Sequence, residues 1–459
     1  MLAVGGNMER ILEKIYTIVW GLPALVMILG VGIYLTGRTG FVQLRLFPQA
    51  WRRFCGMFRG REKSSFRSLC TALGATVGTG NLVGVAGALC LGGPGSIFWM
   101  WVCGFLGMAT KYAEAVLAVR FRTVENGHIV GGPMYYISRR MGAGGRWLAG
   151  IYCFFGIVAA FGVGNATQIN AMLTAFRPLL RPGWELPLRI GAALLVGLLL
   201  SGGAKRIGEA AEKLVPLAAA GYIAVCVIAL ILRFDRIGDA FTQIIRGACN
   251  PKAATGGMLG SVFCALRVGC ARGVFTNEAG MGTAAIAHGS AEVEHPVEQG
   301  MMGLMEVFLD TIVICTLTAL VILCSGARIP FGTDTGGDLT GWAFGAICGD
   351  WTSYFLAAAL SCFAFATILG WGYYGLRCVT YMLGPGREKW FVLTQMAASV
   401  LGATLETGII WRLAETVNGL MAIPNLIALT VLTGEVVAQT KDYPMYSRQK
   451  FRKKPGIQN

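Results

Sequence analysis

The chain has 459 residues; 55% of them are hydrophobic, 14% are charged, 65 are glycine, and the formal net charge is +15. Soluble proteins carry about 25% charged residues, so a soluble globule of this size would lack the charge to cover its surface. The composition therefore excludes a cytosolic enzyme, a disordered chain and a disulfide-built secreted protein, and it indicates a polytopic membrane protein.

Eleven apolar segments follow one another along the chain, and we interpret each as a membrane-spanning helix. They cover about 18–36, 70–91, 95–119, 147–176, 187–201, 209–232, 257–288, 297–324, 353–376, 390–404 and 413–438. The first segment is too long for a signal peptide and no small-residue cleavage site follows it, so we expect it to be retained. The predicted fold class is an all-α polytopic membrane protein with 11 transmembrane helices.

Basic residues are distributed unequally between the two ends of these helices. Lys and Arg number 25 in the tail after residue 440 and the loops 37–69, 120–146, 204–213 and 377–389, but 11 in the alternate connections. The positive-inside rule then places the N-terminus outside and the C-terminus in the cytoplasm. The same bias explains the positive net charge without a nucleic-acid partner. The longest polar interval is about 33 residues, too short for a soluble domain, so the function must reside in the membrane bundle.

Cysteine and histidine give no sign of a metal or redox centre. The 14 cysteines are scattered, many of them inside apolar runs, and no two stand at C-x-x-C spacing. Buried free cysteine behaves as a small apolar residue. The three histidines, His128, His288 and His295, are too few and too far apart to predict a metal cluster.

Two of the eleven segments carry glycine and polar residues at their middle. The second reads LCTALGATVGTGNLVGVAGALCLGG and the seventh reads GSVFCALRVGCARGVFTNEAGMGTAAIAHG. Glycine costs about 1 kcal/mol relative to alanine inside a helix, and polar side chains at membrane depth are by default functional. We interpret both segments as helices broken near the bilayer midplane, where free N–H groups bind an anion and free carbonyls bind a cation.

Close helix packing is the alternative explanation for the glycines of the second segment. Gly74 with Gly78, and Gly80 with Gly84, stand at the G-x-x-x-G spacing of helix contacts. That spacing does not account for the neighbouring polar residues, which are Thr79, Asn81, Asn277 and Glu278. A dinucleotide-binding motif is excluded because no strand–helix unit surrounds Gly78 and Gly80.

The two breaks stand at corresponding places in two halves of opposite orientation. Their centres lie near residues 79 and 277, about 198 residues apart, and paired broken helices in inverted halves indicate a transporter site. The predicted organisation is an N-terminal helix and basic loop, two five-helix inverted repeats (spans 2–6 and 7–11) and a basic tail. Their boundaries are 1–69, 70–232, 233–440 and 441–459.

With these features in place, the chain resembles the alanine-or-glycine:cation symporter family. The resemblance runs from about residue 18 to about 435 and rests on GATVGTGNLVGVAGAL, GGPGSIFWMWVCGFLGMATKYAEAVLAVRFR, GGPMYYI, FGVGNATQINAM, ARGVFTNEAGMGTAAIAH, HPVEQGMMGLMEVFLDTIVICTLTALVIL and ILGWGYYG. It implies a LeuT-type fold of ten core helices with one extra N-terminal helix. It also implies a sodium-coupled symporter, not an enzyme, in the bacterial cytoplasmic membrane.

The resemblance further implies a small neutral amino acid as substrate, with alanine or glycine leading and serine or glutamine behind. Sodium is the implied coupling ion, and no organic cofactor is expected. The stereoisomer, the number of sodium ions and the oligomeric state are not predicted.

A zwitterionic amino acid needs donors for its carboxylate. The half-helix that begins at the first break turns its positive end toward an anion, so we expect the N–H groups near Thr79, Gly80 and Asn81 to hold the carboxylate, as the family pattern also suggests. Gln168 is a predicted side-chain contact to the substrate. An interhelical hydrogen bond involving Gln168 and Asn165 is the alternative.

The same substrate needs acceptors for its ammonium group and a wall for its side chain. Carbonyls near Ala75 and Phe275 are the expected acceptors, and the second break adds Thr276 and Asn277 to the predicted substrate site. Phe275 and Trp371 are expected to form an apolar lid that limits side-chain size. Trp371 as a membrane-interface aromatic is the alternative.

For sodium, unwound carbonyls and hydroxyls are the expected ligands. We predict one site between the carbonyls near Ala75 and Gly78 and the hydroxyl of Thr367. Here the sequence departs from the family pattern, with Ala366 where Ser or Thr is common and Leu376 where Glu is common. The first departure removes one candidate ligand and leaves the strength and ion preference of the site open.

Acidic residues in the spans are Glu114, Glu278, Glu306 and Asp310, and each needs a partner or a cavity in hydrocarbon. Glu278 could pair with Arg272 or cap a half-helix, and Asp310 could hold loose backbone. Proton coupling through one of these acids is an alternative to sodium coupling.

Two other classes of function are weaker. A channel needs rings of ligands around a pore, whereas this chain has two unlike broken helices. An intramembrane enzyme would need a pair such as Glu278 and His288, but these residues do not share a helix face.

Overall fold

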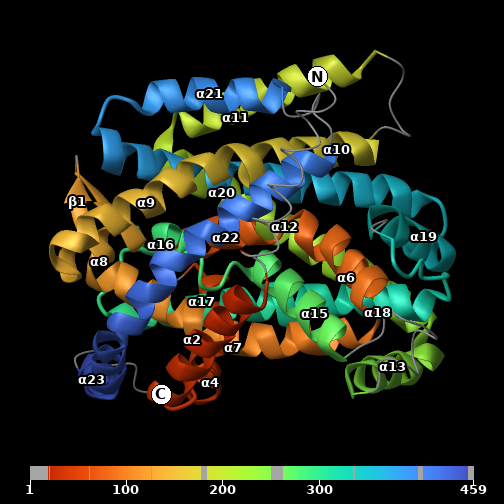
Figure 1. Ribbon diagram of the computed structural model, residues 1–459, viewed down its shortest axis with the longest axis horizontal. Coiled ribbons are helices and arrows are strands. Elements are labelled where there is room, and N and C mark those ends of the chain that lie inside the picture. Colours follow the sequence, from red (N-terminus) through yellow and green to blue (C-terminus); the bar gives the residue numbers. More distant parts are fainter. Residues whose placement is uncertain are drawn as a thin grey trace.

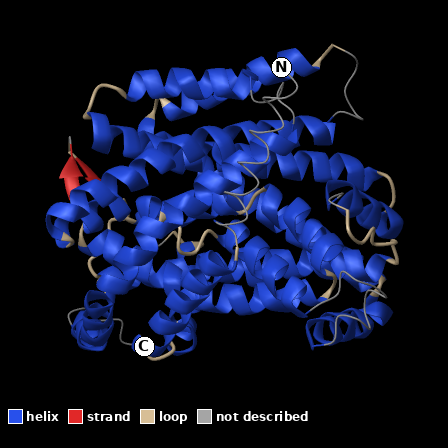
Figure 2. Ribbon diagram, viewed as in Figure 1, coloured by secondary structure: helices blue, strands red, loops and turns tan. Residues whose placement is uncertain are grey.

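The computed structural model describes residues 19, 21–60, 62–125, 127–176, 183–249, 262–333, 336–401 and 407–452. Within them the protein is almost entirely helical, apart from one antiparallel hairpin that the sequence did not predict (Figure 2). Its strands are β1 (Thr123–Glu125) and β2 (His128–Val130), with Val124 opposite Ile129. The chain ends at 1–18 and 453–459, on which part of the orientation prediction depends, lie outside the described residues.

Every predicted apolar segment coincides with a helix or with consecutive helices. These are α2 (Leu22–Arg38), α5 (Lys63–Thr76) with α6 (Val85–Gly92), α7 (Gly95–Arg120), α9 (Gly142–Phe161) with α10 (Thr167–Phe176), α11 (Glu185–Leu200), α12 (Gly203–Leu232), α15 (Val262–Asn277) with α16 (Thr283–His288), α17 (Pro296–Val307) with α18 (Thr316–Ser325), α20 (Trp351–Leu383), α21 (Glu388–Leu401), and α22 (Thr407–Val431) with the start of α23 (Thr433–Arg452). Residues 18 and 20 of the first segment, 257–261 of the seventh and 402–404 of the tenth lie outside the described residues.

Length and composition single out fewer of these helices as membrane spans. Five described helices are long and apolar enough to cross a membrane alone, or up to seven if each bent pair counts as one span. The number 11 therefore stays a prediction, while the multi-helix membrane architecture is confirmed.

Several connections that were predicted as polar loops contain short helices. They are α3 (Val42–Arg45), α4 (Phe47–Met57), α8 (Pro133–Arg140), α13 (Ile237–Cys249) and α19 (Gly336–Cys348). The interval 37–69 is thus largely helical, and α5 begins at Lys63 instead of at 70. The cause in α4 is aromatic packing that a composition count does not detect: Phe47 lies edge-on to Phe308, with ring centroids 4.9 Å apart.

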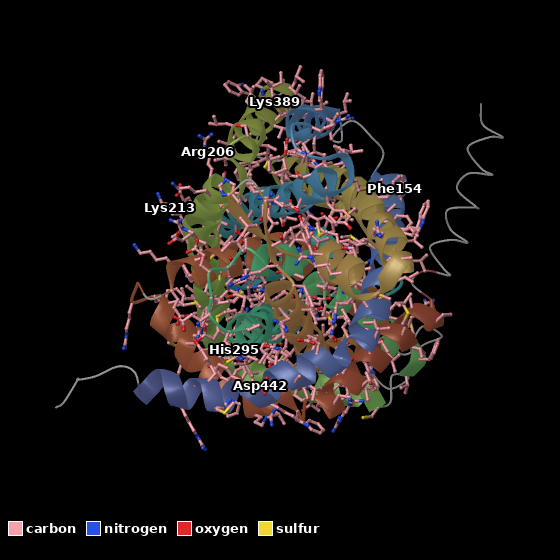
Figure 3. All side chains as sticks on the ribbon, turned by 90° about the vertical axis from the view of Figure 1, so that its left-hand side faces the viewer. Phe154, Arg206, Lys213, His295, Lys389 and Asp442 are labelled. Atoms are coloured by element: carbon pink, nitrogen blue, oxygen red, sulfur yellow. The ribbon has the colours of Figure 1, made fainter. Side chains whose placement is uncertain are left out.

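The long helices run along the long axis of the molecule (Figure 1). The β hairpin, α8 and α23 lie at one end, on the left of Figure 1, whereas α13 and α19 lie at the other end. Figure 3 looks at the first of these ends, where Arg206, Lys213 and Lys389 are seen. This grouping agrees with the two sets of connections that the charge count separated.

Two groups of helices meet at the centre of the molecule. Helix α7 packs against α15 and α17, while α20 packs against α5, α9 and α12. The interrupted pairs α5–α6 and α15–α16 carry the candidate site, with α5 packed on α20 and α15 packed on α7.

Candidate functional site

The first break interrupts the second apolar segment after Thr76. Val77 is extended (φ −75°, ψ 97°), and the chain resumes in a π-helical turn over Gly80–Gly84 that leads into α6, which is bent 51° from α5. The N–H of Gly78 donates to Oδ1 of Asn81 (3.0 Å), so a side chain takes the place of a helical carbonyl. The broken helix predicted here is therefore present.

The second break covers residues 278–282, between α15 and α16. Glu278, Gly280 and Gly282 all adopt left-handed backbone, with φ of 53°, 96° and 75°. Such backbone is unfavourable for a residue with a Cβ, so the strain at Glu278 must be offset by its contacts. Oε1 of Glu114 on α7 accepts the N–H groups of Gly280 (2.9 Å) and Gly282 (3.0 Å), which holds the unwound chain in place.

Buried side chains connect the two breaks through the π-helical stretch Phe308–Cys315. Nδ2 of Asn81 donates to Oδ1 of Asp310 (2.7 Å), and Oγ1 of Thr311 donates to Oδ2 of Asp310 (2.8 Å). Nδ2 of Asn277 donates to Oγ1 of Thr311 (3.2 Å). Asp310 therefore binds Asn81 directly and is connected to Asn277 through the hydroxyl of Thr311.

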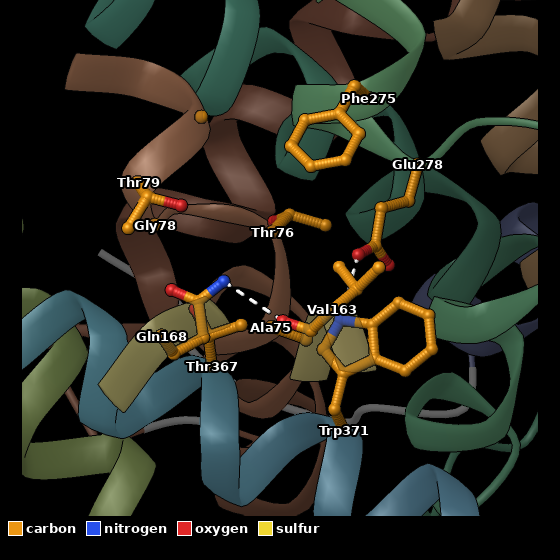
Figure 4. Close-up of a pocket in the computed structure, with 11 residues that line it drawn as sticks. Ala75, Thr76, Gly78, Thr79, Val163, Gln168, Phe275, Glu278, Thr367 and Trp371 are labelled. Carbon is orange, nitrogen blue, oxygen red and sulfur yellow. Dashed lines mark hydrogen bonds between the residues drawn. The ribbon is translucent and has the colours of Figure 1, made fainter. Parts of the chain in front are cut away.

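A pocket with an empty volume of about 270 Å³ lies between the two breaks (Figure 4). Its lining is Ala75, Thr76, Gly78, Thr79, Gly80, Val163, Gln168, Phe275, Glu278, Thr367 and Trp371. The volume open to the centre of a water-sized sphere is about 20 Å³, so the pocket is far smaller than the roughly 300–1,000 Å³ of pockets for drug-sized ligands. Residues predicted for the substrate site and for the sodium site meet in this one cavity.

Three predicted site residues do not line the pocket. Asn81 and Asn277 turn toward the Phe308–Cys315 stretch, and Oγ1 of Thr276 donates to the carbonyl of Gly273 (2.9 Å). They shape the two breaks that the pocket lies between. Conversely, Thr76, Val163 and Glu278 line the pocket without having been predicted there. Only Glu278 had a signal in the sequence, as an acidic residue in the middle of a span.

Two polar atoms at the pocket are buried without a hydrogen-bond partner among the described residues, namely Oγ1 of Thr79 and Oε1 of Gln168. Nε2 of Gln168 donates to the carbonyl of Val163 (3.1 Å), which fixes the amide beside the cavity (Figure 4). An interhelical bond between Gln168 and Asn165 is the alternative that the sequence suggests. In the described contacts Nδ2 of Asn165 donates instead to the backbone carbonyl of Gln395 (2.9 Å). Because buried polar groups are normally paired, these two atoms are available to a polar ligand.

One face of α20 contacts both breaks. Oγ1 of Thr367 donates to the carbonyl of Gly74 (3.0 Å), and one turn later Nε1 of Trp371 donates to Oε1 of Glu278 (3.0 Å). Trp371 is completely buried, so the alternative placement at the membrane interface is wrong. A Cβ on Gly78 would stand only 2.8 Å from Oγ1 of Thr367, so the backbone of Gly78 lies close against this hydroxyl.

The glycines of the first break have different surroundings. A Cβ on Gly74 would meet Val215 (3.1 Å), so close packing explains that glycine, whereas a Cβ on Gly84 would have no neighbour within 4 Å. A Cβ on Gly80 would stand 2.9 Å from Cγ2 of Thr276, near the end of α15. Gly80 is thus a point of close approach between the two interrupted helices.

A second polar cluster lies beside the site and is fully buried. Nζ of Lys111 is 3.2 Å from Oε1 of Glu306, whose Oε2 is 2.8 Å from Nε2 of His288. Nδ1 of His288 contacts Nε2 of Gln299 (2.7 Å), which continues the chain to Ser65 on α5. His288 is therefore paired with Glu306, and the pairing with Glu278 that an enzyme would need is absent from the described contacts.

Comparisons with known proteins show which family this chain resembles. A model of the sodium:alanine symporter family matches residues 6–458. The sodium/alanine symporter AgcS of Methanococcus maripaludis is 41% identical over 94% of this chain and 96% of that protein. The probable sodium/glutamine symporter GlnT of Bacillus subtilis is 35% identical over 96% of this chain and 92% of that protein.

Among solved structures, the crystal structure of MhsT in complex with L-phenylalanine covers 82% of this chain and 97% of its own, with a TM-score of 0.55 and 13% sequence identity. At that identity the match establishes the fold alone, which is LeuT-like.

Proposed function

The chain belongs to the sodium:alanine symporter family, and from this premise we propose that it imports alanine or glycine together with sodium by alternating access. The family transports sodium and an amino acid across a membrane, so this protein is a transporter and not an enzyme. The observation that carries the finer proposal is the small pocket between the two breaks, with its buried unpaired oxygens on Thr79 and Gln168.

In this proposal the substrate lies across the first break. Its carboxylate binds backbone N–H groups near Thr79 and Gly80, at the positive end of the half-helix that continues as α6. Asn81 contributes by holding the N–H of Gly78 and thereby the unwound shape. The amide oxygen of Gln168 and the hydroxyl of Thr79, which lack partners among the described residues, gain them from the substrate.

The ammonium group and side chain of the substrate face the second break. Carbonyls near Ala75 and Phe275 accept from the ammonium group, and the rings of Phe275 and Trp371 form the wall that the side chain meets. Thr276 and Asn277 act from behind the wall by fixing the end of α15. In this proposal the wall leaves room only for hydrogen or a methyl group, as in glycine and alanine.

Sodium binds at the base of the same pocket, between the carbonyls of Ala75 and Gly78 and the hydroxyl of Thr367. Support comes from the position of Thr367, which already contacts the carbonyl of Gly74 (3.0 Å) at the unwound end of α5. An oxygen-only ligand set suits a hard cation, and ligands from the end of α5, the first break and α20 would couple ion binding to the position of the first break against α20.

The predicted division into inverted repeats, spans 2–6 and 7–11, accompanies this mechanism. The breaks at 77–79 and 278–282 support this proposed division, because inverted repeats carry broken helices at corresponding places. Each repeat then contributes one broken helix to a common site, and opposite movements of the two helix groups expose it alternately.

Uptake of alanine or glycine is expected to require an inward sodium gradient. The test is uptake of the labelled amino acid into liposomes that contain the purified protein, under separate sodium and proton gradients. Equal uptake with choline in place of sodium, at fixed pH, would show that sodium is not the coupling ion. Uptake driven by the proton gradient alone would favour the proton-coupled alternative.

Two exposed native cysteines test the predicted orientation in the bacterial cytoplasmic membrane. Cys55 lies on α4, within the connection predicted to be cytoplasmic, whereas Cys249 ends α13, on the predicted outside. In variants that retain one of them, a membrane-impermeant maleimide should label Cys249 in right-side-out vesicles and Cys55 only after the vesicles are opened. The opposite pattern contradicts the proposed topology.

A further inference from the structure

Trp371 and Glu278 form a hydrogen bond that crosses the pocket from α20 to the second break (Figure 4). Oε1 of Glu278 accepts from Nε1 of Trp371 (3.0 Å), and Oε2 accepts from Oγ1 of Thr283 (2.6 Å). All three residues are at most 3% exposed. Both oxygens of the carboxylate are thus already used by the protein, one of them to hold the indole.

The position of this carboxylate is set by the break itself. Glu278 has left-handed backbone, its N–H donates to the carbonyl of Val274 (2.8 Å), and its carbonyl accepts from Met281 (3.1 Å). Glu114 binds the next two glycines of the break. Glu278 is therefore a fixed acceptor, held at a backbone conformation that is otherwise unfavourable.

The indole is held on its other side by close packing. A Cβ on Gly164 would stand 2.3 Å from Cβ of Trp371, so the tryptophan lies directly against the backbone of the π-helical turn Gly162–Ala166. The ring of Tyr374 is edge-on to the indole at 5.9 Å. With backbone behind it, the tryptophan depends on the bond to Glu278 for its angle across the pocket.

We propose that Glu278 is the positioning residue that fixes Trp371 as the wall of the pocket, and that it thereby limits the substrate to amino acids with small side chains. This inference rests on the proposed function, because it concerns the size limit of that same transport site. Without the acceptor, the buried N–H of the indole would lack a partner, and such a group reorients toward another one. A reoriented indole would open space beside Phe275.

The rival role for Glu278 is electrostatic: its negative charge would attract the ammonium group of the substrate. The two roles make different demands on the side chain. Positioning requires an acceptor for Nε1 of Trp371, which glutamine supplies without charge. Attraction of the ammonium group requires the charge, which glutamine lacks.

The test compares Glu278→Met with Glu278→Gln. The two side chains have similar length, and each carries a Cβ, so the cost of the left-handed backbone at this position is the same in both variants. Initial rates of sodium-driven uptake of alanine and leucine are measured in liposomes, and the leucine-to-alanine ratio is the readout. Glu278→Met should raise this ratio by about tenfold, within the range that pocket space for a methylene group gives. Glu278→Gln should keep the leucine-to-alanine ratio within about twofold of wild type.

A matched control removes a similar bond elsewhere. Nε1 of Trp101 donates to Oγ1 of Thr316 (2.8 Å), away from the pocket lining. Thr316→Val should leave the ratio unchanged. Thr283→Val removes the hydrogen bond to the second oxygen of Glu278 without creating space, and thereby loosens the acceptor of Trp371. It should raise the leucine-to-alanine ratio by about threefold. This variant carries the test if Glu278→Met does not fold.

The other possible outcomes separate the positioning role of Glu278 from the proposed transport function. An unchanged ratio in Glu278→Met, or in Thr283→Val where that variant carries the test, overturns the positioning role. A shift in Glu278→Gln as large as in Glu278→Met also overturns it, because the charge would then be what matters. Wild-type protein that takes up no small neutral amino acid with sodium overturns the proposed function instead.

Discussion

Gly80→Val is expected to lose alanine binding while the protein still inserts and folds. A Cβ at this position stands 2.9 Å from Cγ2 of Thr276 and 3.6 Å from the ring of Phe275, so the valine forces the two breaks apart. Overpacking of this kind costs about 1–3 kcal/mol, and each 1.4 kcal/mol is about a factor of ten in affinity. Loss of the close backbone approach should weaken binding by roughly 100-fold.

The matched variant is Gly84→Val, in the same π-helical turn. Because a Cβ on Gly84 has no neighbour within 4 Å, this variant should bind alanine almost normally. The measurement is alanine binding to purified protein that elutes as a single folded species. Near-normal affinity in Gly80→Val would show that the carboxylate is held elsewhere. Equal damage from both variants would show that the glycines serve helix packing alone.

Thr367→Val is expected to raise the sodium concentration needed for half-maximal uptake by roughly 10- to 100-fold, the range found when metal sites lose a supporting group. Valine has nearly the same shape as threonine, so the pocket keeps its volume. The hydroxyl that contacts the carbonyl of Gly74, and that we propose as a sodium ligand, is removed. Alanine uptake is measured as a function of sodium concentration at constant ionic strength.

Thr380→Val is the control for this variant, because it lies on the same helix and Oγ1 of Thr380 donates to the carbonyl of Leu376 (2.9 Å). It should leave the sodium dependence unchanged. If Thr367→Val behaves like Thr380→Val, the sodium ion is bound without Thr367, and the proposed site is wrong.

The main features of the fold were predictable because the membrane imposes them. Hydrocarbon requires long apolar helices, and a glycine-rich, polar stretch inside such a helix is costly unless it has a function. The two breaks were therefore visible as sequence, and the residues around Gly78 and Phe275 were found together in one pocket. Short helices such as α4 were missed because basic residues hide their apolar contacts in a composition count.

The site was less predictable where it depends on the direction in which a side chain points. Asn81 and Asn277 were expected to face the substrate, yet their side chains bond to the Phe308–Cys315 stretch. Spacing along a sequence does not show which way a side chain turns once the helix is unwound. Val163 illustrates the opposite case, since an apolar residue within a span gives no signal that its carbonyl holds Gln168.

The buried pair of Lys111 and Glu306 has a consequence for how the chain is made. Their charged groups are 3.2 Å apart with no exposure, but 195 residues separate them in the chain. At about 5–20 residues per second, the partner of Lys111 is synthesised about 10–40 s after it. A lysine alone at the bilayer centre costs about 2.5–3.5 kcal/mol even by the lowest scales. Until α17 is made, the acidic group nearest to Lys111 in the chain is Glu114, three residues later on the same helix, so the final pairing of α7 is completed only late in synthesis.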